Sequence, residues 1–111
     1  VAYKGYVGGA KKSAATNSML QISLQEQEYQ SIYGDYFIQS GCTPDQDTTD
    51  AINTDLFETT EDEPVVAAEG YRFCVDTHTT GFVVKACMWD GSACKADETV
   101  LTLNTKGSNN F

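Results

Sequence analysis

The spacing of apolar residues between Ala14 and Tyr33 predicts an amphipathic helix. Its predicted buried face steps by four, three, four, three and four residues through Ala15, Met19, Ile22, Glu26, Tyr29 and Tyr33. This is the period of one face of an α-helix, interrupted only by Glu26. Leu20, Leu24 and Ile32 are expected to widen the face that packs on a core. Gly34 is expected to end the helix, and Met19, Ile22, Tyr29 and Tyr33 are its predicted core residues.

The first residues are expected to continue the same helix, which would then run from residue 2 to about residue 33. Glycines at positions 5, 8 and 9 each cost about 1 kcal/mol in a helix interior. The apolar stripe here is thin, and we predict that it forms an assembly face: Tyr3, Tyr6, Val7 and Ala10. A helix of about 32 residues spans ~48 Å, so its first half should protrude from the domain.

Residues 34–63 are predicted to be an acidic connecting loop. The stretch is rich in Asp, Glu and Thr and poor in large apolar residues. Ile52, Leu56 and Phe57 are expected to hold it down through one short helical turn. A loop of this length inside a domain is usually functional or mobile.

The acidic loop also raises the question of a calcium site. Counted from Asp45, the loop positions where an EF-hand requires Gly and Glu hold Asp50 and Leu56. An EF-hand is therefore excluded. A looser site using Asp45, Asp47 and Asp50 stays open, although the expectation is a solvated surface segment without a metal ion.

After Pro64 the apolar period changes from about 3.6 to two, which predicts β-strands. Strands are expected over residues 71–77, 82–88 and 99–105, with a possible fourth over 64–68. Gly81, Gly91 and Gly107 mark the turns, and the predicted core positions of the strands are Phe73, Val75 and Val84. Residues 64–111 would form an antiparallel sheet with C-terminal loops. The whole chain, 1–111, is predicted to be one α+β domain with a long N-terminal helix on a small antiparallel sheet.

The net charge is −9, and only seven residues are Lys or Arg. Nucleic acid is therefore not an expected partner, because phosphate backbones require clustered basic residues. No cofactor is expected. Catalysis is not expected either, because no nucleophile, base and orienting group come together in the sequence. The single histidine, His78, lies in a Thr-rich hairpin, and the acidic residues lie mostly in loops where nothing raises their pKa.

Four cysteines in a short chain without a CxxC pair favour disulfides over zinc. We favour the pairing Cys42–Cys74 and Cys87–Cys94. In this interpretation Asp90-Gly91 forms a two-residue hairpin turn with Cys87 opposite Cys94, and both bridges lie outside the core. The alternative pairs Cys74 with Cys87 and Cys42 with Cys94.

Several stretches resemble type IV pilins. "AYKGYV" (residues 2–7) resembles the segment that follows the membrane-spanning half of a pilin helix, and "AKKSAA" (10–15) the small and basic stretch after it. "EQEYQSIYGDY" (26–36) resembles the Glu- and Tyr-rich end of that helix. "LTLNTKG" (101–107) resembles a closing pilin strand. The resemblance is good over residues 1–36, weak over the last dozen residues and absent between them.

The resemblance implies a pilin-like α/β roll and a structural role in a type IV pilus, or fimbrium. Such a subunit associates with its own copies into a helical filament for cell adhesion, motility or surface attachment. The resemblance also implies an extracellular location on a bacterial cell, and before assembly an inner-membrane anchor and contact with the pilus assembly machinery. About 25 apolar residues are expected to precede the sequence, which is about the length of a membrane span.

Two alternatives stay open. A pseudopilin of type II secretion shares the helix and sheet, but such proteins often use a calcium site in place of disulfides. A free-standing secreted binding module or adhesin would instead use the acidic loop to recognise a ligand.

Overall fold

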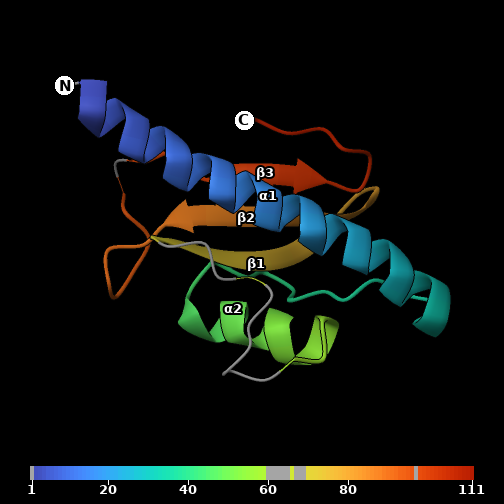
Figure 1. Cartoon of the computed structure of the whole chain (residues 1–111). Coiled ribbons are helices and arrows are strands. Elements are labelled where there is room, and N and C mark those ends of the chain that lie inside the picture. Colours follow the sequence, from blue (N-terminus) through green and yellow to red (C-terminus); the bar gives the residue numbers. More distant parts are fainter. Residues whose placement is uncertain (1, 60–65, 67–69, 97) are drawn as a thin grey trace.

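In the computed structural model of the chain, helix α1 (Ala2–Tyr33) lies across one face of a three-stranded antiparallel sheet (Figure 1). The structure describes residues 2–59, 66, 70–96 and 98–111, and for residues 2–10 the backbone alone. The strands are β1 (Tyr71–His78), β2 (Gly81–Met88) and β3 (Leu101–Asn104), in the order β1-β2-β3. The predicted α+β class is therefore correct. The possible fourth strand at 64–68 lies outside the described residues except for Val66, which is in no strand.

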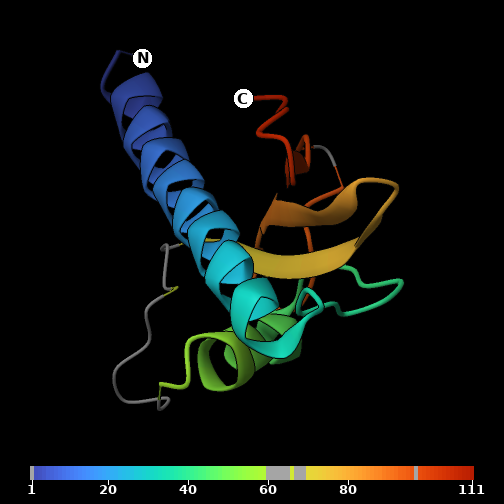
Figure 2. The ribbon, with the colours of Figure 1, turned by 90° about the vertical axis from the view of Figure 1, so that its right-hand side faces the viewer.

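The core lies between α1 and the sheet (Figure 2). Val84 is in register with Val75 on one side and with Leu103 on the other, so their side chains share a face. Met19 and Ile22 of α1 are fully buried in the same cluster. Five of the predicted core residues are therefore buried: Met19, Ile22, Phe73, Val75 and Val84.

The end of α1 departs from the predicted face. Tyr33 was predicted to be buried, but it is 58% exposed because the helix ends there, beyond the sheet. Its ring packs on Tyr29, with centroids 4.5 Å apart, and Tyr29 itself is half-buried at the edge of the core. Leu20, Leu24 and Ile32 were expected to widen the buried face, but all three are exposed. Leu24, for example, lies two residues beyond Ile22, about 200° around the helix, and so it faces away from the sheet.

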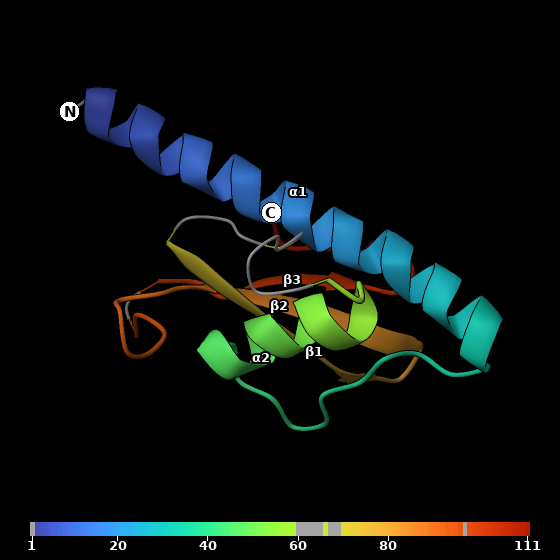
Figure 3. The same ribbon diagram turned by 60° about the horizontal axis from the view of Figure 1, so that its bottom comes forward.

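The acidic connection is helical over eleven residues, where only one short turn was predicted. It contains α2 (Gln46–Ala51) and the π-helical turn η1 (Ile52–Leu56), which lie beside β1 (Figure 3). Asp45 and Thr48 form a capping box, because the Asp45 side chain accepts from Thr48 N–H and Thr48 Oγ1 accepts from Asp45 N–H. Ile52 and Leu56 are buried in the main core, so the segment is not a solvated loop.

Side chains from the connection also occupy the free edge of β1. Thr49 Oγ1 accepts from Phe73 N–H (2.9 Å), and Thr48 Oγ1 donates to Phe73 O (2.8 Å). Gln39 makes two hydrogen bonds with Val75. The Gln39 backbone N–H donates to Val75 O (2.6 Å), and Gln39 Oε1 accepts from Val75 N–H (3.0 Å).

The C-terminal segment runs along the free edge of β3 in the same way. Asn104 N–H donates to Ser108 O over 3.0 Å, and Thr102 N–H donates to Asn110 Oδ1 over 2.8 Å. The Asn110 amide also donates to Val100 O (2.9 Å). The last residues are thereby tied to the sheet by asparagine side chains.

Two disulfides lie on the sheet face away from α1. Cys42 is bonded to Cys74 and Cys87 to Cys94, which is the pairing favoured from sequence. Neither bridge belongs to the core cluster beneath α1, as expected, but Cys74 and Cys87 are nevertheless buried. The reason is that residues 42–44 cover this part of the sheet, where Cys42 O accepts from Lys85 Nζ over 3.3 Å.

The turn before Cys94 is longer than predicted. In the backbone pairing Cys94 lies opposite Trp89 and not opposite Cys87, although its sulfur is bonded to that of Cys87. Four residues, Asp90 to Ala93, therefore make the turn. Asp90 N–H donates to Ala93 O over 3.0 Å. The Asp90 carboxylate accepts from Ser92 N–H and Ala93 N–H, both over 2.8 Å. These bonds favour the longer turn over a two-residue Asp-Gly hairpin.

Candidate functional site

The side of α1 that faces away from the sheet is the strongest candidate site for association. We call it the outer face of α1 and define it by its exposed residues between positions 13 and 32. These are Ser13, Ala14, Asn17, Leu20, Gln21, Leu24, Gln27, Glu28, Ser31 and Ile32.

Large apolar side chains are exposed on this face. Leu20 is 48% exposed, Leu24 is 72% and Ile32 is 64%. Leu20 and Leu24 are one helical turn apart, and Ile32 follows two turns later, so the three form a stripe along the helix. Beside Ile32 a hollow of about 120 Å³ separates the end of α1 from η1, lined by Tyr29, Leu56 and other residues. An apolar stripe next to a hollow is the kind of surface that another helix can pack against.

The same face is almost without charge. Glu28 is its only charged residue, although the whole chain has 16 Asp and Glu residues. Glu26, the other acidic residue of α1, points inward and is fully buried. A surface with one carboxylate is unusual on a chain of net charge −9, and it removes most of the repulsion that two copies would otherwise meet there.

Glu26 is a buried acid that the sequence analysis treated only as a break in the apolar stripe. Its Oε1 accepts the backbone N–H of Phe37 over 2.8 Å, while Oε2 has no hydrogen-bond partner among the described residues. Burial raises its pKa from 4.5 to about 8, and the Phe37 hydrogen bond lowers it by less. The expectation that nothing raises the pKa of acidic residues was made for those in loops, and Glu26 lies in α1, where burial raises its pKa.

Of the three residues considered for a calcium site, Asp45 and Asp50 are engaged in local structure, and Asp47 is exposed in the first turn of α2. Asp45 caps α2, and Asp50 accepts from Gln46 Nε2 over 2.8 Å. Within the described ranges, no three His, Cys, Asp or Glu residues are grouped so that they could hold a metal ion. None of the described helices is long and apolar enough to cross a membrane.

His78 lies at the end of β1, where its Nδ1 is 2.9 Å from Thr80 Oγ1. The only salt bridge found in the described part of the chain joins Lys85 Nζ to Asp76 Oδ2, 2.8 Å apart. The Lys85 hydrogen bond, with others from Gly41 and Thr77, lowers the Asp76 pKa to about 2. These groups stabilise the fold and do not form a nucleophile, base and orienting set.

The residues predicted as an assembly face, Tyr3, Tyr6, Val7 and Ala10, belong to the first turns of α1. Their side chains lie outside the described part of the structure, so the prediction for them stays open. The candidate site that the structure does describe begins at Ser13, farther along the same helix. Comparisons of the chain with protein-family models, curated proteins and solved structures found no match.

Proposed function

We propose that the chain is the globular part of a type IV pilin-like subunit, which associates with its own copies into an extracellular fibre through α1. The observation that carries this proposal is the outer face of α1, which is apolar at Leu20, Leu24 and Ile32 and holds one charge. The resemblance of residues 1–36 to pilins also supports a role for α1 in association between subunits.

The balance of forces on two copies favours contact at this helix. Elsewhere two subunits of charge −9 would repel each other at short range. At the outer face, contact would bury three large aliphatic side chains, each worth about 1.5–3 kcal/mol when it goes from exposed to fully buried. This gain in free energy from burying the three side chains would oppose the entropy cost of association.

The two disulfides fit a protein of an oxidising compartment. They favour a pilus subunit over a type II secretion pseudopilin, which more often relies on calcium.

The test uses the full-length chain in its own host. We expect surface filaments that contain this chain, detected by immunogold labelling and mass spectrometry. Leu24→Asp should abolish the filaments while the globular domain keeps its thermal midpoint. Val100→Asp is the matched control, because Val100 is an exposed apolar residue outside α1, and filaments should persist in that variant.

Two results would overturn the proposal. One is a full-length sequence in which α1 is not preceded by a short leader and an apolar segment of about 20 residues. The other is normal filament formation by the Leu24→Asp variant.

A further inference from the structure

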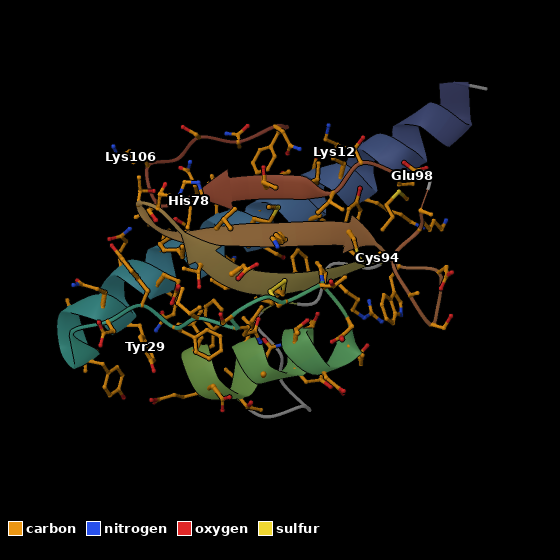
Figure 4. All side chains as sticks on the ribbon, turned by 180° about the vertical axis from the view of Figure 1, so that it is seen from behind. Lys12, Tyr29, His78, Cys94, Glu98 and Lys106 are labelled. Atoms are coloured by element: carbon orange, nitrogen blue, oxygen red, sulfur yellow. A yellow bond between two sulfur atoms is a disulfide. The ribbon has the colours of Figure 1, made fainter. Side chains whose placement is uncertain are left out.

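A second site lies on the sheet face away from α1, at the end of the sheet near His78 and Lys106 (Figure 4). It is an open pocket of about 370 Å³, which lies at the small end of the range for small-molecule sites, roughly 300–1,000 Å³. We call it the β3 pocket. Its lining residues are His78, Val83, Thr102, Asn104, Ser108, Asn109 and Asn110.

The lining is apolar at one residue and otherwise carries amide, hydroxyl and imidazole groups. Val83 lies at the centre of the row, in register with Asp76 on one side and Asn104 on the other. No Asp, Glu, Lys or Arg lines the β3 pocket. The nearest charges in the register, Asp76 and Lys85, are already bonded to each other over 2.8 Å.

Internal hydrogen bonds hold the Asn104 side chain in place and leave its amide NH₂ group free. Its Oδ1 accepts from Lys106 N–H (3.0 Å) and from Ser108 N–H (3.1 Å). Nδ2 has no partner among the described residues, so it presents two N–H donors from a fixed side chain. The loop that follows β3 therefore fixes the orientation of Asn104 Nδ2 without forming a hydrogen bond to it.

His78 is oriented in the same way. Thr80 Oγ1 lies 2.9 Å and Thr80 N lies 3.3 Å from His78 Nδ1, so Thr80 holds the ring through this nitrogen. Nε2 has no partner among the described residues. The hydroxyls of Thr102 and Ser108 are also unbonded there, and each can donate and accept. Side chains from β1, β3 and the C-terminal segment thus supply four free hydrogen-bonding groups around Val83.

We infer that the β3 pocket binds a neutral sugar. A sugar ring presents adjacent hydroxyls that donate and accept, together with C–H groups that can rest on Val83. Charged ligands and metal ions lack their usual partners in this lining. A phosphate or carboxylate would need a lining cation, and a metal ion would need carboxylates, but no charged side chain lines the pocket. The pocket would stay open in a fibre assembled through α1, but the inference does not depend on that assembly.

The experiment is a titration of the isotope-labelled chain, followed by amide chemical shifts in NMR. The probes are galactose, glucose, mannose, N-acetylglucosamine and N-acetylgalactosamine, each up to tens of millimolar, with inorganic phosphate as the charged comparison. We expect saturable shifts at residues 78, 83 and 102–110 with at least one sugar, with a dissociation constant in the millimolar range. Phosphate should cause none.

Asn104→Asp is the decisive variant, because its carboxylate can still accept from Lys106 and Ser108 while the free donors are lost. It should weaken binding of the responding sugar at least about tenfold. Asn17→Asp, the same change on the outer face of α1, should leave binding unchanged. Ser108→Ala provides a second test that does not alter the charge, and it should also weaken binding. The inference is overturned if no sugar shifts the pocket residues, if phosphate alone does, or if Asn104→Asp binds as tightly as the unaltered chain.

Discussion

The backbone N–H of Phe37 donates to the Glu26 carboxyl over 2.8 Å and so joins the segment that follows α1 to the inner side of that helix. The acid is fully buried, and its other oxygen has no hydrogen-bond partner among the described residues. A carboxyl in this position is more stable with its proton on, because a buried charge without a counter-ion is costly. The proton on Glu26 therefore affects how firmly the chain closes over the end of the core.

The first prediction is a loss of stability as the pH rises. The Glu26 pKa is about 8 in the folded chain and close to 4.5 when unfolded. Between these values the folded state keeps a proton that the unfolded state has released. The unfolding free energy should therefore be highest below about pH 4.5 for this group and fall by up to ~1.4 kcal/mol per pH unit toward pH 8. Denaturant unfolding across this range measures the slope.

Glu26→Gln should flatten this dependence, because the amide can still accept from Phe37 and does not titrate. The variant should be more stable than the unaltered chain near pH 8. Glu28→Gln, an exposed change on the same helix, is the control and should keep the slope. Asp76, whose pKa is lowered to about 2, acts in the opposite direction. Its contribution is lost only as the pH falls from about 4 toward 2, outside the Glu26 window. An equal slope in Glu26→Gln and the unaltered chain would contradict the prediction.

The second prediction ranks the two disulfides. Cys42–Cys74 joins residues 32 apart in sequence, and Cys87–Cys94 joins residues 7 apart. On a chain-entropy model the longer loop contributes about 3.7 kcal/mol and the shorter about 2.5 kcal/mol. Replacing both cysteines of one bridge by Ala should therefore lower the unfolding free energy more for the first pair. Thermal and denaturant unfolding of the two double variants, under non-reducing conditions, compares them. A larger loss from the Cys87–Cys94 pair would show that strain or local packing dominates.

The third prediction separates the two sides of α1. Met19 is fully buried, so Met19→Ala should cost about 2–5 kcal/mol. Leu24 is 72% exposed, and Leu24→Ala should change the stability of the monomer by less than about 0.5 kcal/mol. Both substitutions lie in one helix and have similar helix propensity, so the difference reports burial alone. Similar melting temperatures for the two variants would disprove the assignment of the faces.

The period of two predicted the sheet, and the helical period predicted the buried positions Met19 and Ile22. The helical period did not orient Leu24 correctly, because apolar residues lie on both sides of that predicted face while the sheet covers only one side of α1. The helix at 46–56 had a readable signal in Asp45 and Thr48, which have capping-box spacing. The acidic composition of the stretch concealed it.

The burial of Glu26 and the β3 pocket had no such signal. Glu26 is enclosed only when residues 36–38 fold back over the end of the core. The β3 pocket exists only because Asn104 and Asn110 hold the C-terminal segment along β3. Both depend on contacts between segments that share no periodic pattern, and a single sequence does not report these contacts.

The side chains of Thr48, Thr49 and Gln39 on β1, and the C-terminal segment on β3, bear on how copies of the chain can join. At the middle of both sheet edges, the backbone groups that would receive an incoming strand already have partners. Joining by strand addition would require these bonds to break first, and uncontrolled amyloid-like stacking faces the same barrier. A polymer of the kind proposed above would therefore have to grow through contacts between side chains, where each interface could be altered by substitution without disrupting the sheet.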